Sequence, residues 1–169
     1  MIISVINLKG GSGKTTTAMA LATAAARHNR NVSVLDTDPQ GDATTWAGDA
    51  EDAGETLPFT VDSANIGKLK RLRKTMADDE LVIIDCPPVE IVTDARVIND
   101  YVDRTLFVVR AGLFDKAMLP DLDALYRDGE YRGLCCVLNG TASSDGYYGN
   151  YGTYGHYGYY GHKGGSYYS

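Results

Sequence analysis

The chain has 169 residues, a formal net charge of −6 and an apolar fraction of 44%. This length predicts one domain with a buried core. The acidic balance gives no global argument for binding nucleic acid or an anionic membrane. No apolar run approaches the roughly 20 residues of a membrane helix. Three cysteines, two of them adjacent, form neither a disulfide framework nor a zinc pattern, which favours a reducing, cytoplasmic location.

Short apolar runs alternate with helical patterns through residues 1–140. The first run, "MIISVI", is strand-like, which predicts no signal peptide. In chain order, the expected strands are 2–7, 32–36, 59–61, 81–85, 105–109 and 134–139, and the expected helices are about 15–28, 65–77, 94–101 and 116–128. This alternation predicts an α/β fold with a doubly wound, mostly parallel sheet and helices on both faces. Ligands bind such sheets at the carboxyl ends of the strands.

A glycine-rich segment, "NLKGGSGKTTT" (7–17), lies between the first strand and the first helix, which is the context of a phosphate-binding loop. Glycine permits close backbone approach, and the N–H groups at a helix start attract phosphate. We expect Lys14 to contact the β- and γ-phosphates and the Thr15 hydroxyl to reach Mg²⁺. The residues predicted to bind the nucleotide here are Gly10, Gly11, Ser12, Gly13, Lys14, Thr15 and Thr16.

Carboxylates follow the second and fourth expected strands. Asp36 and Asp38 alternate on an extended segment that turns at Pro39, so both can face one site. The ordinary alternative for this pair is a turn or a helix N-cap. Asp85 follows the apolar run "LVII", and a carboxylate in that position needs a partner, which Mg²⁺ would supply.

A basic segment, "KLKRLRK" (68–74), carries five basic residues in seven. Apolar residues recur beside it at helical spacing, at Ile66, Leu69, Leu72 and Met76, so the basic side chains fill the outer face of a helix. The favoured interpretation is a solvated face. Contact with DNA phosphates or with anionic lipid is the alternative.

Residues 141–169 differ sharply in composition, being rich in Gly, Tyr, Ser and His and almost without aliphatic side chains. Such a segment cannot offset its ordering entropy, so we predict a disordered tail after a single domain at 1–140. The tail holds nine of the twelve tyrosines as candidate phosphate acceptors, namely Tyr147, Tyr148, Tyr151, Tyr154, Tyr157, Tyr159, Tyr160, Tyr167 and Tyr168. The alternatives are an aromatic tail that self-associates and an inert extension.

Residues 1–90, with "KGGSGKTT", "DTDPQGD" and "LVIIDCPP", resemble the ParA/MinD superfamily of deviant Walker P-loop ATPases, within the SIMIBI-like P-loop NTPases. The resemblance implies that Lys9 is a signature lysine that contacts nucleotide across a dimer interface. It also implies that Asp36 supports a metal shell with Thr15 and Asp85, and that Asp38 orients or deprotonates the attacking group. Lys9, Lys14, Asp36 and Asp38 are then the expected catalytic residues. A solvated turn lysine is the alternative for Lys9.

From about residue 81, "PPVEIVTDA", "LFVVRAG" and the tyrosine cluster resemble the bacterial tyrosine kinases (BY-kinases) of capsule and exopolysaccharide export. In both families an asparagine at the position of Asn139 reads the adenine edge. A turn asparagine before Gly140 is the alternative.

Three functions therefore share ATP and Mg²⁺ as cofactors. The favoured function is a tyrosine autokinase of polysaccharide export that phosphorylates its C-terminal tyrosines in trans and needs a membrane-protein activator. The second is a ParA-like partition ATPase that dimerises with ATP, binds DNA nonspecifically and responds to a stimulating partner. The third is a catalytically idle, nucleotide-dependent interaction module. We expect a homodimer or higher homo-oligomer, in the cytoplasm or at the inner face of the cell membrane.

Overall fold

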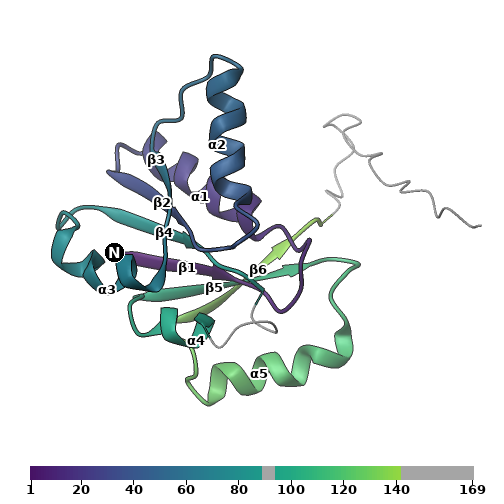
Figure 1. The fold of residues 1–169 in the computed structure, drawn as a ribbon. Coiled ribbons are helices and arrows are strands. Elements are labelled where there is room, and N and C mark those ends of the chain that lie inside the picture. The colour runs from purple at the N-terminus through teal and green to yellow at the C-terminus, as the bar shows by residue number, and fades with distance from the viewer. Residues whose placement is uncertain (89–93, 142–169) are drawn as a thin grey trace, which may run out of the picture.

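A single parallel sheet of six strands forms the centre of the domain (Figure 1). The computed structural model describes residues 1–88 and 94–141, with side chains except at 94–96. The strands are β1 (Ile2–Ile6), β2 (Val32–Asp36), β3 (Thr60–Ser63), β4 (Leu81–Asp85), β5 (Arg104–Arg110) and β6 (Leu134–Asn139), in the order β3-β2-β4-β1-β5-β6. All pairings are parallel. Every residue of β1 and β4 is buried, which explains why both are apolar except for Ser4 and Asp85.

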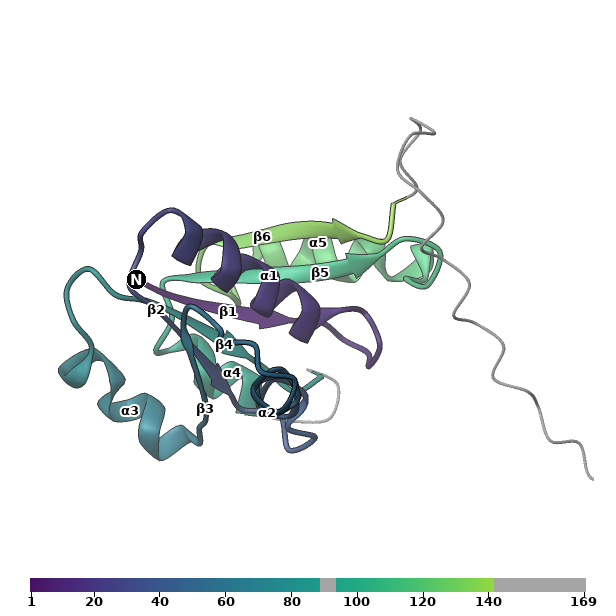
Figure 2. The ribbon, with the colours of Figure 1, turned by 90° about the horizontal axis from the view of Figure 1, so that it is seen from above.

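Helices cover both faces of this sheet (Figure 2). They are α1 (Lys14–Arg27), α2 (Asp42–Asp52), α3 (Ile66–Thr75), α4 (Asp94–Asn99), the 3-10 turn η1 (Lys116–Met118) and α5 (Leu119–Arg127). One core cluster joins the sheet to α1 and α2, and the other joins it to α3, α4 and α5. Alternate strand residues serve the two clusters, with Ile3 and Val5 in the first and Ile2 and Ile6 in the second. The predicted doubly wound fold is confirmed.

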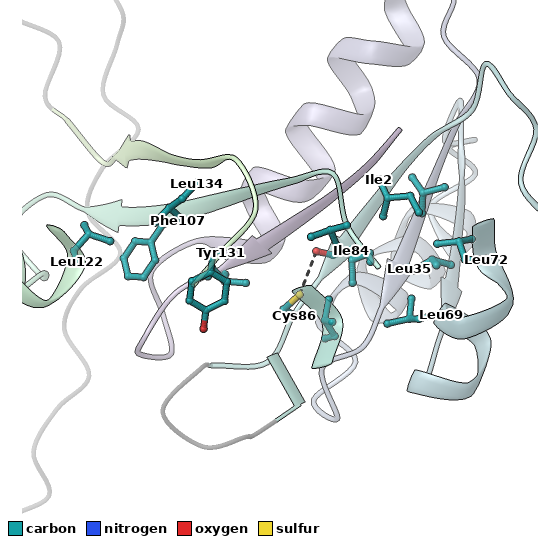
Figure 3. Close-up of a cluster of buried hydrophobic side chains, with 14 residues drawn as sticks. Ile2, Leu35, Leu69, Leu72, Ile84, Cys86, Phe107, Leu122, Tyr131 and Leu134 are labelled. Carbon is teal, nitrogen blue, oxygen red and sulfur yellow. Dashed lines mark hydrogen bonds between the residues drawn. The ribbon is translucent and has the colours of Figure 1, made fainter. Parts of the chain in front are cut away.

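The cluster beneath α3, α4 and α5 is shown in Figure 3. Phe107 is fully buried there, and its ring lies edge-on to Phe114 with centroids 6.2 Å apart. Cys86 packs in the same cluster, and its thiol donates a hydrogen bond to the Ile84 carbonyl at 3.7 Å. Burial raises the pKa of the Cys86 thiol to about 12, so this cysteine is a packing residue and no nucleophile.

Helix α2 is the element that the sequence patterns did not predict. Of its side chains only Ala43 is buried, so it lacks the apolar stripe by which the other helices were found. Local contacts position it instead. Gly41 caps it in the left-handed region at φ +67°, and Thr44 donates from N–H and hydroxyl to the Asp36 carboxylate at 3.0 and 3.3 Å.

The predicted tail at 141–169 lies outside the described residues except for Thr141, so the tail, its nine tyrosines and the boundary at 140 stay predictions. Within the described part of the chain, no helix has the length and apolar character needed to cross a membrane.

Replacing Leu69 by Ala tests the packing of α3, because this side chain is fully buried. We expect the free energy of unfolding to fall by about 2–5 kcal/mol, measured by urea denaturation. Leu138→Ala is the matched control, since that leucine is 60% exposed, and its effect should stay within about 0.5 kcal/mol. Equal losses in the two variants would contradict the observed packing.

Candidate functional site

The loop between β1 and α1 is shaped by two glycines in the left-handed region. Gly11 has φ +74° and Gly13 has φ +92°. Gly13 is also the N-cap of α1, and a Cβ there would overlap the side-chain amide of Asn139. No side chain caps α1 and its first turn holds no acidic residue, so its N-terminal N–H groups remain available to an anion.

Asn7 ties the start of this loop to the sheet. It is buried at the end of β1, where its side-chain amide donates to the Val108 carbonyl of β5. Its side-chain oxygen accepts a hydrogen bond from the Lys9 N–H at 2.7 Å. The backbone at Lys9 is therefore fixed, while the Lys9 side chain is exposed.

Two further strands hold the rest of the loop. Arg110 of β5 donates from Nη1 to the Gly11 carbonyl at 2.7 Å. Asn139 of β6 donates from Nδ2 to the Ser12 carbonyl at 3.1 Å. Asn139, predicted to read adenine, thus contacts the loop itself, and its proposed role toward the base stays a prediction.

A lysine and a carboxylate are both buried where the loop enters α1, and their charges interact. Lys14 is 7% exposed and Asp85, at the end of β4, is 0% exposed. The Thr15 hydroxyl donates to Asp85 Oδ2 at 2.6 Å. Burial raises the pKa of Asp85 to about 6; the charges of Asp36 and Asp38 add to this rise, and the Thr15 hydrogen bond and Lys14 oppose it. The structure thus places Thr15, Lys14 and Asp85 close together, and their roles toward nucleotide and Mg²⁺ stay predictions.

Asp36 and Asp38 lie beside this pair but differ in their surroundings. Asp36 is buried, and its Oδ1 accepts from the Asp38 N–H at 3.1 Å while its Oδ2 accepts from Thr44. Asp38 is partly buried, and its Oδ1 accepts from the Gln40 N–H at 3.0 Å. Asp36 therefore holds the segment leading into α2, and its support of a metal shell stays a prediction.

The residues present fit a magnesium nucleotide better than an isolated metal ion. Among the buried side-chain atoms of the described residues, Ser12 Oγ and Asp85 Oδ1 lack a hydrogen-bond partner. The described part of the chain holds no group of three or more His, Cys, Asp or Glu side chains that could bind a metal by itself. Mg²⁺ commonly takes one or two carboxylates together with substrate phosphates and water. A nucleotide would supply those phosphates here.

Sequence reasoning missed three residues that build this site, namely Asn7, Thr37 and Arg110. Thr37 donates from its N–H and its hydroxyl to the Asp85 carbonyl at 2.9 and 2.8 Å, which fixes the end of β4. Arg110 could have been found by the pattern that identified Asp85, because both are charged residues at the carboxyl end of an apolar strand. Asn7 likewise ends an apolar run. Thr37, inside the acidic segment, had no signal of its own.

A cleft of about 680 Å³ lies beside the two carboxylates. Asp36 and Asp38 line one side, and Ile66, Leu69 and Ile98 supply an apolar floor. Its volume is in the range of small-molecule sites. A hydroxyl group bound there would lie beside Asp38.

Comparison with known proteins identifies relatives by sequence. Residues 3–125 match the CbiA family, the CobQ/CobB/MinD/ParA nucleotide binding domain. The chain is 39% identical over 87 residues to maintenance of carboxysome distribution protein A of Gloeobacter kilaueensis, covering 52% of this chain and 38% of that protein. It is 34% identical over 113 residues to chromosome-partitioning ATPase Soj of Thermus thermophilus (51% and 45%). It is 31% identical over 114 residues to ParA of Rhizobium radiobacter (68% and 50%). The chain spans half or less of the length of these curated relatives.

Solved structures share the fold at lower identity. The kinase domain of Escherichia coli tyrosine kinase ETK has a TM-score of 0.65 at 22% identity, covering 89% of this chain and 72% of that one. A plasmid partition protein from Borrelia burgdorferi has a TM-score of 0.61 at 18% identity (81% and 77%). Cobyrinic acid a,c-diamide synthase from Mycobacterium smegmatis, with bound ATP analog and magnesium, has a TM-score of 0.61 at 21% identity (80% and 72%).

The raised pKa of Asp85 predicts a pH dependence of stability in metal-free solution. Its folded pKa of about 6 exceeds the ordinary value of 3.8, so between these pH values the folded state retains a proton that the unfolded state has lost. Unfolding free energy should therefore fall as pH rises from about 4 to about 6, by on the order of 2–3 kcal/mol relative to Asp85→Asn. Urea denaturation of both proteins in EDTA measures the difference, and parallel pH profiles would contradict the assigned burial.

Proposed function

Since the chain belongs to the CobQ/CobB/MinD/ParA family of nucleotide-binding domains, we propose that it is a Mg²⁺-ATP-dependent ATPase of the partition type. The observation that carries the proposal is the Thr15–Asp85 hydrogen bond, set beside buried Lys14 and leaving Asp85 Oδ1 without a partner. The relatives at 31–34% identity, Soj and ParA, support the partition type over other members of the family.

Each group of the site has a part in the proposed activity. The uncapped N–H groups at the start of α1 bind the phosphates, and Lys14 compensates their charge. Thr15 and Asp85 would hold Mg²⁺, which when bound neutralises charge on the β- and γ-phosphate oxygens. Asp38, at the edge of the site, orients the attacking water and accepts its proton.

Lys9 is the residue that links this chemistry to a second copy. Its backbone is fixed by Asn7, while its side chain is exposed and has no hydrogen bond or ion pair to the described residues. A lysine held this way can reach outward with little loss of backbone entropy. We propose that it contacts nucleotide bound in the partner, so that ATP stabilises a homodimer. In a partition-type protein, nonspecific DNA and a stimulating protein complete the set of partners.

Two lysine variants separate binding from dimerisation. Lys14→Ala should weaken Mg²⁺-ATP binding by about 100-fold or more, because it removes the only cation buried at the loop among the described residues. Lys9→Ala should bind ATP within about threefold of the wild type yet lose ATP-dependent dimerisation. Fluorescent-nucleotide titration and light scattering measure these properties. Dimerisation that survives in Lys9→Ala would contradict the role of this lysine.

A tyrosine autokinase is the second candidate, and specific features favour it. The C-terminal residues carry nine tyrosines, and the cleft beside Asp38 has an apolar floor suited to an aromatic ring. The chain also shares its fold with the ETK kinase domain over 89% of its length. In this function Asp38 accepts a proton from a tyrosyl hydroxyl in place of water. A membrane-protein activator and a location at the inner face of the membrane would follow.

Incubation with Mg²⁺-ATP, followed by mass spectrometry and a phosphate-release assay, decides between the candidates. The partition-type proposal predicts released phosphate without phosphotyrosine. Phosphotyrosine at 147–168, absent in Lys14→Ala, would establish the kinase instead. In either case Asp38→Ala should bind ATP normally and slow turnover by about 100-fold or more. ATP binding without either product would leave the idle interaction module.

A further inference from the structure

Surface charge is segregated onto two helices of this acidic protein. Helix α2 carries four acidic residues and no basic one, namely Asp42, Asp49, Glu51 and Asp52. Helix α3 carries five basic residues and no acidic one, namely Lys68, Lys70, Arg71, Arg73 and Lys74. This separation of charge is not needed to hold the helices on the domain. Helix α2 is held by Ala43 and Thr44, and helix α3 is held by Leu69 and Leu72.

The outer face of α3 is a row of unpaired cations. Leu69 and Leu72 point into the core, so the helical period turns Lys70, Arg71 and Lys74 outward, and all three are exposed. The two flanking cations are already used: Lys68 pairs with Asp62 at 3.7 Å and Arg73 with Asp103 at 2.5 Å. The three outward cations form no ion pair with any described residue.

The outer face of α2 is its acidic counterpart. With Ala43 turned inward, Asp42, Asp49 and Asp52 are exposed, and none forms an ion pair within the described part of the chain. Asp42 and Asp49 line an open hollow that Thr15 and Thr16 of the loop also border. Trp46 lies among them with 44% of its surface exposed. Exposed tryptophan is enriched among the residues that contribute most to binding in protein interfaces.

The two faces cannot meet within one molecule. Helix α2 packs with the cluster on the α1 side of the sheet, and α3 packs with the cluster on the opposite side. Both helices are about 15 Å long, so the faces match in length as well as in charge. We propose that the acidic face of α2 in one copy docks on the basic face of α3 in the next, with Trp46 stacking on Arg71.

This contact is heterologous, so a pair of copies still has one acidic and one basic face free, and the assembly grows as an open chain or closes as a ring. A second copy is favoured over nucleic acid because the matching acidic face is part of the same protein. The contact needs no nucleotide, which distinguishes it from the proposed ATP-dependent dimer through Lys9.

Sedimentation velocity of the full chain without nucleotide tests this association. We expect the mean sedimentation coefficient to rise with protein concentration at about 20 mM salt and to stay constant at about 500 mM, where charges are screened. Because Trp46 is the only tryptophan, its emission should shift to shorter wavelength as it becomes buried in the low-salt assembly. A wild-type protein that stays monomeric at low salt would overturn the proposal.

Variants with reversed charge on either helix test whether α2 and α3 form the contact. Lys70→Glu/Arg71→Glu and Asp49→Lys/Asp52→Lys should each lose self-association, and an equimolar mixture of the two should recover it, because each variant then offers the faces that the other lacks. All four residues are exposed and the new lysines suit the carboxyl end of α2, so circular dichroism and melting temperature should change little.

Lys116→Glu/Arg132→Glu reverses exposed cations elsewhere and should associate as the wild type does. A mixture of the two charge-reversed proteins that stays monomeric would overturn the proposal. The proposal would also be overturned if wild type does not self-associate but binds a duplex oligonucleotide, and Lys70→Glu/Arg71→Glu does not bind it. That result would make α3 a nucleic-acid surface.

Discussion

The burial of two opposite charges, Lys14 and Asp85, at the carboxyl edge of the sheet is the constraint on which the site depends. Asp85 ends β4, a strand covered on both faces, so the carboxylate inherits the burial of the core. Burial of a charge is costly unless it is paired and hydrogen-bonded. Here the Thr15 hydrogen bond and Lys14 compensate only part of that cost, and one carboxylate oxygen remains without a partner. A bound magnesium nucleotide would complete the compensation.

The surrounding fold holds the loop in advance of any ligand. Three neighbouring strands contribute one polar side chain each, Asn7 from the end of β1, Arg110 from β5 and Asn139 from β6. Each binds a backbone group of the loop, so the loop conformation is held by the strands around it. Donors fixed before binding act on a ligand without reorganisation, which is how preorganised sites gain most of their effect.

The sequence predicted the features that a local residue pattern defines. Apolar runs predicted all six strands, and the glycines with Lys14, Thr15 and Asp85 predicted the centre of the site, because buried parallel strands and phosphate loops impose strict local patterns. Helix α2 was missed because it buries one alanine and is held by contacts to Asp36. Asn7 and Arg110 were missed because their roles arise only when β1 and β5 become neighbours. The fold is shared by partition proteins and the ETK kinase domain, so it does not decide between their reactions.

The most direct test of the central claim is a calorimetric titration of the folded protein with ATP, carried out with and without Mg²⁺ in two buffers of different ionisation enthalpy. The account predicts saturable heat at about one ATP per chain that depends on Mg²⁺. It also predicts that, near pH 6, the two buffers give different heats because Asp85 releases its proton as the site fills. Folded protein that gives no magnesium-dependent heat would contradict the account.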